Sequence, residues 1–598
     1  MNLGIRAQGS KNMVTLIAAL VMQTPSHVAV RQVATHWTLT VDGKPFPVKG
    51  AGGNGSWAML AAAGGNTART WGADNLESDL ANAQKAGVKV MVGIWLGHKE
   101  QGFKYDDPAQ VTKQFEAAKA VIQKYKDNPA VLMWGIGNEM EGYDQGDDPN
   151  VWTAVEDIAH MAHKIDPNHP TATVIAEIGG KKVPSIMSMC PSIDIIGINS
   201  YAGCASIYDR YVKQGGAKPY IITECGPPGT WETANTPWKR PIELTSTEKE
   251  GWYEKAYTAN VIGHPDLCIG CLPFLWSHKQ EATATWFGMF LPDGTKLGAV
   301  DVMQKLWSGK APAHPCPRIA KLTLDGDPAV DPGDTVTAHL LATDPGGDPV
   351  KTTWTLTGDG STPGVGGTTE DVPDAVAGAV TTSNDASAVV KMPTTPGPYR
   401  LFVVIRNQHG GAAVANVPLR VRGAAPVEMG GKVHLPFVLY SGVSSTLPYV
   451  PSGWMGSAGN MKLEMASAEN PHTGSKCIRW DYTAGDGWGG IAWQSPEGDW
   501  GDKPGGYDLT GAKKLTLWAR GRNGGEQISF AVGIIKSNKK YADTAIVDSG
   551  KHTLTDGWQK FTIDLTGKDL KRIKTGLVMT ITTQGQPVTV FLSDIQVE

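Results

Sequence analysis

Two glutamates stand at the ends of apolar, strand-like segments of this sequence. Glu139 closes the run "VLMWGIGNE", and Glu224 closes "YIITE". A pair of carboxyl groups in one cleft can cleave a glycosidic bond. One of them must be protonated to deliver a proton to the leaving oxygen, and the other must be ionised to attack the anomeric carbon or to activate water. A single glutamate at a strand end is ordinarily solvated, so this interpretation depends on the pair.

The surroundings of each carboxyl group predict which role it takes. Arg69 and the phenol of Tyr201 would hold Glu224 ionised through opposite charge and hydrogen bonding. Partial burial and the nearby anionic Glu224 would raise the pKa of Glu139. We expect that burial to come from two tryptophans, Trp134 and Trp276. The sequence therefore predicts that Glu139 is the acid and Glu224 the ionised partner.

The elements that must position these residues form a regular alternation from residue 34 to residue 312. Eight apolar segments of strand length alternate with amphipathic helical segments, for example 75–87, 108–126, 148–166 and 245–263. The expected strands are 46–53, 65–71, 88–96, 130–139, 171–178, 193–201, 219–226 and 268–276. This pattern favours a (β/α)₈ TIM barrel, in which the carboxyl ends of all strands share one mouth. A doubly wound open sheet is the alternative, but "GAGGNG" (50–55) lacks the context of a dinucleotide-binding loop.

The motifs at the strand ends resemble those of the clan A retaining glycoside hydrolases, and the barrel is similar to those of the family 2 and family 5 β-glycosidases. The resemblance covers about residues 38 to 310 and is carried by "NPAVLMWGIGNE" (128–139), "IITECG", "NTARTW", "INSY" and "LPFLW". In family 2 enzymes β-sandwich domains precede the barrel, whereas here the barrel comes first. The resemblance is therefore to the clan.

The resemblance implies a role for each matching residue. Glu224 would be the nucleophile and Glu139 the acid/base of a retaining double displacement, with carboxyl groups about 5–5.5 Å apart. Asn138 would bond the 2-hydroxyl of the sugar, and Trp276 would form the floor of the reacting subsite. The remaining matches to substrate-binding positions of the clan are Arg69, His98 and Tyr201.

Further aromatic residues fall in segments expected near the mouth. Each of them is either a platform for a sugar ring or a packing residue, and the sequence leaves that choice open. They are Trp57, Trp95, Tyr143, Trp231 and Trp286. We expect Glu141, two residues beyond Glu139, to be a solvated loop residue.

Two all-β regions follow a Pro-rich linker at 308–318. The spacing of short alternating strands predicts an immunoglobulin-like sandwich over 317–423. A second β-sandwich is expected over 425–598, and it resembles the jelly-roll carbohydrate-binding modules that accompany such barrels. Relatives of those modules hold a structural calcium ion near the last strand, which makes Asp594 a candidate ligand. We expect no cofactor for catalysis and no catalytic metal.

Composition and the N-terminus limit the partners and the location. The formal net charge of −4 argues against nucleic acid and anionic membranes. The seven cysteines lack a paired CxxC array, which argues against structural zinc, and Cys268 and Cys271 are expected to be buried thiols. Residues 1–30 have the basic and apolar regions of a secretory signal, which predicts a secreted or periplasmic protein.

The leading hypothesis is a retaining β-glycoside hydrolase that acts on an oligosaccharide or polysaccharide, with a β-glucan favoured. Endo action and transglycosylation stay open, and a monomer is expected. The alternative is a non-catalytic polysaccharide-binding protein on a barrel scaffold. A metal-dependent hydrolase has little support, because His98 stands nearly alone at the strand ends.

Overall fold

The computed structural model describes residues 24–142, 145–360, 372–423, 430–442, 447–483, 487–582 and 584–598. The chain divides into two compact units, Met1–Gly423 and Ala424–Glu598, and each is described by itself. The segment 1–23, which holds most of the expected secretory signal, lies outside the described residues, as does Tyr143.

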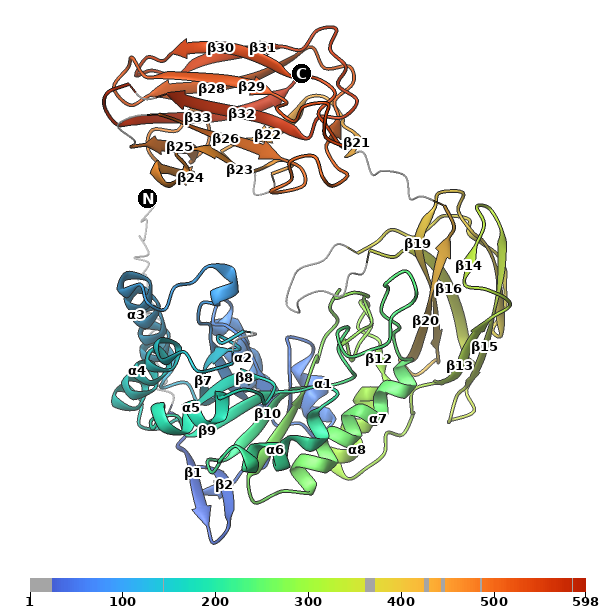
Figure 1. Ribbon diagram of the computed structural model, residues 1–598. Helices are drawn as coiled ribbons and strands as arrows, with labels where there is room; N and C mark the ends of the chain where they lie inside the picture. Colours follow the sequence, from blue (N-terminus) through green and yellow to red (C-terminus); the bar gives the residue numbers. More distant parts are fainter. Residues whose placement is uncertain are drawn as a thin grey trace, which may run out of the picture. The chain divides into compact units, whose positions relative to one another are not determined.

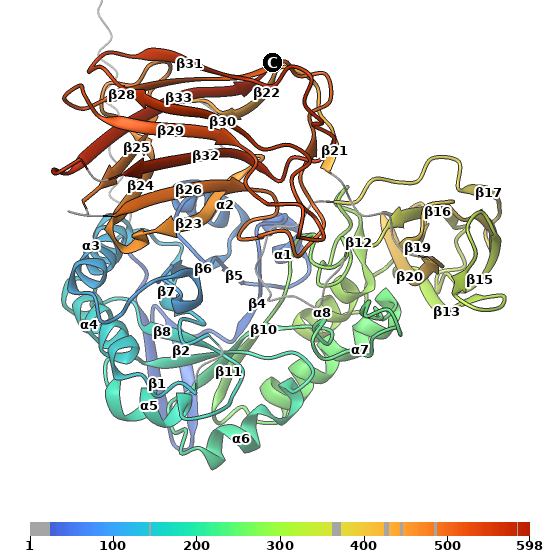
Figure 2. The ribbon, with the colours of Figure 1, turned by 45° about the horizontal axis from the view of Figure 1, so that its top comes forward.

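The first unit contains the predicted barrel, and the fold class is confirmed. Eight parallel strands close in the order β10-β11-β4-β5-β6-β7-β8-β9 (Figures 1 and 2). They are β4 (Val48–Gly52), β5 (Thr67–Arg69), β6 (Lys89–Ile94), β7 (Val131–Asn138), β8 (Thr171–Ala176), β9 (Ile195–Asn199), β10 (Tyr220–Cys225) and β11 (Cys268–Pro273). Strands that are buried on both faces need continuous apolar runs, which is the pattern of the eight segments.

Helices surround the barrel strands (Figure 2). They are α1 (Trp57–Ala62), α2 (Leu76–Ala86), α3 (Pro108–Tyr125), α4 (Pro149–Ile165), α5 (Lys182–Met189), α6 (Ile207–Lys213), α7 (Ser246–Tyr257) and α8 (Gly298–Ser308). Local signals set their starts. Asp107 caps α3 before Pro108 at the first turn, and Thr245 with Glu248 forms the predicted capping box of α7.

A hairpin of β1 (Val28–Val33) and β2 (His36–Val41), with the short β3 (Lys44–Pro45) beside it, precedes the barrel. Val28 and Leu39 share a buried apolar cluster with barrel residues such as Met133. The Ser26 hydroxyl also donates to the carbonyl of Val131 at 2.9 Å. The last residues of the segment 1–30, which has the features of a secretory signal, therefore pack on the barrel from Ser26 onward. This packing could not be predicted from the sequence, because a few apolar residues in a short segment do not indicate which surface they cover.

The immunoglobulin-like region is a sandwich that shares a sheet with the barrel unit. One layer pairs β13 (Arg318–Leu324), β15 (Thr335–Thr343), β18 (Ser387–Lys391) and β17 (Val380–Ser383). The other contains β16 (Lys351–Gly358), β19 (Gly397–Arg406), β20 (Gly411–Val421) and β14 (Ala329–Val330). The short β12 (Lys296–Leu297), which precedes α8, pairs in parallel with β20. This pairing ties the sandwich to the barrel.

The second unit is a β-sandwich with two main sheets. One contains β24 (Met461–Ser467), β25 (Cys477–Tyr482), β33 (Val588–Val597), β28 (Lys514–Gly521), β31 (Gln559–Asp564) and β22 (Phe437–Tyr440). The other contains β23 (Val450–Gly456), β26 (Trp488–Gln494), β32 (Thr575–Thr582), β29 (Gln527–Val532) and β30 (Val547–Thr553). A small two-stranded sheet pairs β21 (Gly430–Lys432) with β27 (Tyr507–Asp508).

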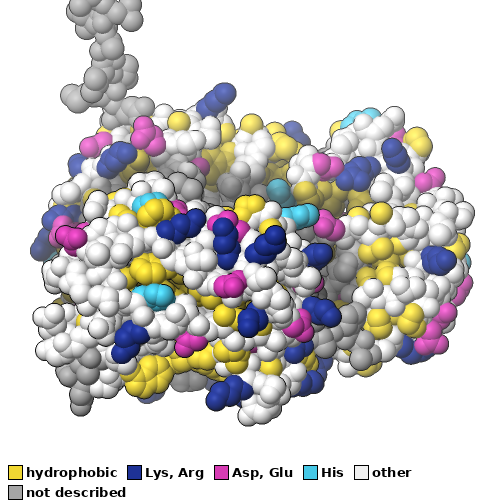
Figure 3. All heavy atoms as spheres, turned by 90° about the horizontal axis from the view of Figure 1, so that it is seen from above, with side chains coloured by type: hydrophobic (Ala, Val, Ile, Leu, Met, Phe, Trp, Pro, Cys, Tyr) yellow, Lys and Arg dark blue, Asp and Glu magenta, His cyan; other side chains and the backbone are white. Residues whose placement is uncertain are grey.

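The surface carries no charge field of one sign on the face shown in Figure 3, where Lys and Arg lie among Asp and Glu. This mixture agrees with the net charge of −4. Among the described residues, no helix combines the length and apolarity that crossing a bilayer requires. All seven cysteines are buried free thiols, as expected for Cys268 and Cys271.

Candidate active site

Glu224 lies near the carboxyl end of β10 and accepts hydrogen bonds from three side chains of the barrel mouth. Arg69 Nη1 donates to Oε1 at 3.0 Å, and Trp71 Nε1 donates to the same oxygen at 2.7 Å. The hydroxyl of Tyr201 donates to Oε2 at 2.9 Å. An ionised carboxylate only accepts hydrogen bonds, so this set of donors suits the anionic form.

Glu139 directly follows β7 and has the left-handed backbone conformation, with a φ of 55°. The preceding Gly137 also has a positive φ, and a Cβ there would lie 2.0 Å from the sulfur of Met140. A non-glycine residue at positive φ is strained, and such strain concentrates at functional sites. The turn ends the strand and places the Glu139 carboxyl within reach of Asn199.

The protonation of Glu139 is shifted strongly. Burial raises the pKa of Glu139 to about 7, and the neighbouring Glu224 carboxylate adds to the rise. A hydrogen bond of 2.6 Å from Asn199 Nδ2 to Glu139 Oε1 acts in the opposite direction and lowers the pKa. At neutral pH, Glu139 is therefore able both to give and to take a proton.

Two asparagines join the surroundings of the two carboxyl groups into one network. Arg69 Nη2 donates to Asn138 Oδ1 at 2.6 Å, and Asn199 Nδ2 lies 3.2 Å from the same oxygen. The Thr223 hydroxyl orients the Asn199 amide by donating to its oxygen at 2.7 Å. The same guanidinium thus contacts Glu224 and positions the amide that precedes Glu139.

The structure brings five predicted residues into this network: Arg69, Asn138, Glu139, Tyr201 and Glu224. His98 and Trp95 lie near it as a pair of stacked rings, with centroids 4.7 Å apart, and burial lowers the pKa of His98. Trp231 packs its ring edge-on to Tyr201 at 5.8 Å. Trp95 is 47% exposed and Trp231 is 53% exposed, so both rings are available to a ligand.

Three of the candidate sugar platforms are buried. The prediction that Trp276 forms the floor of the reacting subsite is wrong, and the choice left open for Trp57 and Trp286 is decided in favour of packing. Trp276 is fully buried, packs against Phe290 and Trp307, and donates its Nε1 hydrogen to the carbonyl of Ser56. Trp57 and Trp286 are likewise buried, and their ring nitrogens donate to backbone carbonyls. A ring covered on both faces by protein cannot stack on a sugar.

Two other expectations are also corrected. Trp134 does not bury Glu139, because its ring lies in the core and its Nε1 donates to Asp166, the residue that ends α4. Glu141 is not solvated: it is 2% exposed, and its carboxylate lies 3.2 Å from Lys182. Its Oε1 accepts the backbone N–H of Ala176, which fixes the segment that follows Glu139.

Trp71 and Asn199 also contact the carboxyl pair, and neither contact was predicted from the sequence. Trp71 stands two residues after Arg69, and Asn199 stands two residues before Tyr201. Side chains two residues apart in extended chain share a face, so the alternation alone was a usable signal. Both residues contact a carboxyl group of the pair directly.

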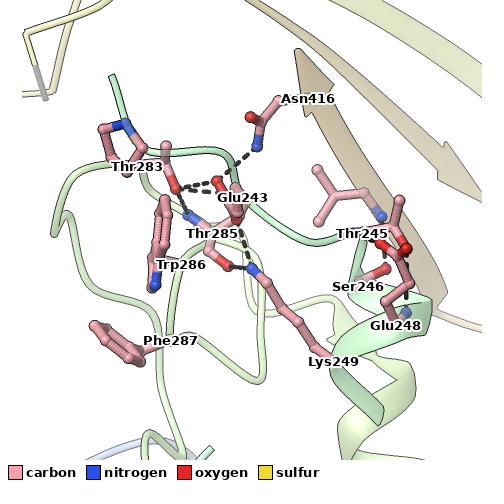
Figure 4. Close-up of polar contacts among 12 residues, drawn as sticks. Glu243, Thr245, Ser246, Glu248, Lys249, Thr283, Thr285, Trp286, Phe287 and Asn416 are labelled. Atoms are coloured by element: carbon pink, nitrogen blue, oxygen red, sulfur yellow. Dashed lines mark hydrogen bonds and ion pairs between the residues drawn. The ribbon is translucent and has the colours of Figure 1, made fainter. Parts of the chain in front are cut away.

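A loop between β11 and β12 supports the site from the side of the immunoglobulin-like sandwich (Figure 4). Thr283 and Thr285 of this loop donate hydrogen bonds of 2.7 and 2.9 Å to the buried Glu243, which lies in the segment just before α7. Burial alone would raise the pKa of Glu243, but the ammonium of Lys249 at 2.5 Å outweighs it and lowers the pKa. Asn416 of β20 donates to Glu243 at 2.6 Å.

The same loop reaches the nucleophile candidate. Phe287 follows Trp286 in the loop, and its ring centroid lies 5.1 Å from that of Tyr201. Tyr201 in turn donates to Glu224. A continuous set of contacts therefore runs from the sandwich through Glu243 and the loop to the catalytic carboxylate candidate.

The calcium expectation for Asp594 does not fit the residues around it. Its two carboxylate oxygens accept hydrogen bonds from His472 at 2.7 Å and Thr473 at 2.5 Å. Calcium prefers a shell of oxygen ligands, and an imidazole nitrogen does not supply one.

The comparisons with known proteins agree with this architecture. Residues 79–237 match the TIM barrel domain of the glycosyl hydrolases family 2. The matched segment begins within α2 and ends beyond β10, so it lies within the closed parallel barrel. A search of the curated proteins found no match.

Solved structures that resemble the chain include three β-glucuronidases. The Bacteroides uniformis β-glucuronidase 2 is 12% identical with a TM-score of 0.39, and the match covers 95% of this chain and 67% of that enzyme. The Ruminococcus gnavus enzyme is 15% identical with a TM-score of 0.38, and the match covers 48% of this chain and 53% of that enzyme. The Dictyoglomus thermophilum enzyme is 18% identical with a TM-score of 0.37, and the match covers 47% of this chain and 53% of that enzyme. This chain thus spans about half the length of the last two, and at these scores the likenesses carry no argument about substrate.

Proposed function

We propose that this protein is a retaining β-glycoside hydrolase with Glu224 as nucleophile and Glu139 as acid/base. The observation that carries the proposal is the contrast between the two carboxyl groups. Glu224 accepts hydrogen bonds from Arg69, Trp71 and Tyr201, whereas burial raises the pKa of Glu139 to about 7. A general acid must be protonated and a nucleophile must be ionised, so the two carboxyl groups need environments that favour different protonation states.

The reaction has two steps. In the first, a Glu224 oxygen attacks the anomeric carbon while Glu139 gives its proton to the leaving oxygen, which forms a covalent glycosyl-enzyme. In the second, the Glu139 carboxylate takes a proton from water or from an acceptor sugar, and the new oxygen displaces Glu224. The Asn138 amide is proposed to bond the 2-hydroxyl, because its oxygen is already held by Arg69.

The substrate is proposed to be a polymer, with a β-glucan favoured. Support comes from the two exposed tryptophans. Trp95 follows β6 and Trp231 follows β10, and these strands are four positions apart in the ring of eight. Aromatic rings on opposite sides of the mouth can hold sugars on both sides of the cleaved bond. This arrangement favours endo action. We further propose that the protein is monomeric and is secreted or periplasmic.

The test is Glu224→Gln, assayed on a panel of linkage-defined β-glucans together with an aryl β-glucuronide and other aryl β-glycosides. We expect the variant to lose at least about 10³-fold in kcat while it still binds glycan. The first product of the wild type should keep the β configuration by NMR. Equal cleavage before and after the substitution contradicts the mechanism. Glycan binding without cleavage by the wild type supports a non-catalytic binding protein instead.

A further inference from the structure

Two histidines and an aspartate gather where the barrel unit continues into the immunoglobulin-like sandwich. His314 lies in the segment between α8 and β13. Asp348 lies in the turn between β15 and β16, and His409 lies in the turn between β19 and β20. Three segments that are distant in sequence therefore contribute one side chain each.

The three side chains are close enough to share one ion. One ligand atom of each lies within 4.8 Å of those of the other two. The imidazole rings of His314 and His409 are stacked, with centroids 3.7 Å apart and an interplanar angle of 12°. His409 Nε2 lies 3.3 Å from Asp348 Oδ2. To share an ion, the two exposed imidazoles would have to turn out of this stack, because the lone pairs of parallel rings do not converge on one point.

Hydrogen bonds from neighbouring residues orient Asp348 and the segments that carry the two histidines. The amide of Gln408 donates to Asp348 Oδ1 at 2.8 Å, which leaves Oδ2 facing His409. Asn407 Nδ2 donates to the carbonyl of Pro315 at 3.1 Å, so the residue next to His314 is tied to the turn that carries His409. Such outer contacts orient the ligands of metal sites.

We propose that His314, Asp348 and His409 form a binding site for a divalent transition-metal ion of the zinc class. Two imidazoles and one carboxylate are a donor set that suits Zn²⁺, and water completes a tetrahedral shell. Calcium and magnesium prefer oxygen ligands and are not expected to bind.

A bound ion would link the segment after α8 to two turns of the sandwich. The sandwich also contacts the barrel through the bond from Asn416 to Glu243 and through Arg400, which donates to the carbonyl of Pro241. The ion is therefore expected to stabilise the first unit by mass action and to raise its unfolding temperature. The proposal is independent of the glycosidase function.

The test is calorimetric titration of the full, untagged and EDTA-treated chain with ZnCl₂. We expect one ion per chain with saturable binding, and His314→Ala, Asp348→Asn and His409→Ala should each weaken it by at least about tenfold. Zn²⁺ should also raise the unfolding temperature of the wild type, whereas CaCl₂ should not. The two histidines are exposed and Asp348 is half-buried, so retention of the fold is checked in each variant by circular dichroism.

His339→Ala is the matched control, because His339 pairs with Asp325 at 3.0 Å in the same sandwich and, among the described residues, belongs to no group of three possible metal ligands. This variant should bind Zn²⁺ as the wild type does. The proposal is overturned if the wild type shows no saturable binding. It is equally overturned if His314→Ala and His409→Ala bind with unchanged affinity.

Discussion

Asn416 of the immunoglobulin-like sandwich donates a hydrogen bond of 2.6 Å to Glu243 of the barrel unit. Glu243 in turn accepts hydrogen bonds from Thr283 and Thr285, which belong to the same loop as Phe287. The ring of Phe287 packs against that of Tyr201. The sandwich is thus part of the support of the candidate active site, although it contributes no residue to the carboxyl pair.

Asn416→Ala should lower both stability and turnover. The substitution leaves a buried carboxylate with one donor fewer, which costs about 1–3 kcal/mol of unfolding free energy. Looser packing of Phe287 on Tyr201 should reduce kcat several-fold and leave KM for a small aryl glycoside nearly unchanged. Asn384→Ala is the control, since the Asn384 side chain accepts hydrogen bonds only within its own turn among the contacts described. Equal kcat losses in both variants would argue against the route through Glu243.

Glu139→Gln should affect substrates according to their leaving group. General acid catalysis contributes about 10²–10⁴-fold, so kcat on a natural glycan should fall by that order. An activated aryl glycoside needs little protonation of its leaving oxygen, and its first step should be much less affected. Pre-steady-state measurement of aryl release checks this. A uniform loss on both substrates would count against Glu139 as the acid.

The pH profile should have an alkaline limb near neutrality. Glu139 must be protonated to act as an acid, and its pKa is raised to about 7. The active form is therefore present below that pH and is lost as the pH rises through about 7. The profile of kcat/KM, which reports the free enzyme, is the measurement. An alkaline limb that is unchanged in Glu139→Gln would contradict the assignment.

Asn199→Ala should move that limb to higher pH. The Asn199 amide donates to Glu139 and lowers its pKa. Without the donor the carboxylate form is less favoured, so the pKa rises and the acid stays protonated to a higher pH. The shift of the limb is diagnostic, because a general loss of fold would lower the profile without moving it.

Trp276→Ala should affect stability, whereas Trp231→Ala should affect substrate binding. Trp276 is fully buried, and its truncation should cost about 3–5 kcal/mol of unfolding free energy. Trp231 is 53% exposed, so its truncation should leave stability nearly unchanged but raise KM for a polymeric glycan. Thermal unfolding and kinetics on polymer and aryl glycoside separate the two. A stable Trp276→Ala variant with weakened glycan binding would restore its predicted role as a platform.

The sequence by itself determined the barrel and the carboxyl pair. Strands buried on both faces must be apolar along their length, so eight such runs between helices specify a closed parallel barrel. The end of the apolar run also indicates where β7 reaches the mouth, because that run gives way there to Asn138 and Glu139. Glu224 and Arg69 were found in this way.

Only the tertiary structure decided which aromatic residues are accessible and what supports the site. Trp231 and Trp286 both follow barrel strands in irregular segments, yet one is exposed and the other is buried. Their exposure depends on which distant segments pack over them, and no local periodicity encodes that. The contact between Asn416 and Glu243 likewise joins residues far apart in sequence, and it exists only because a whole sandwich packs against the barrel unit.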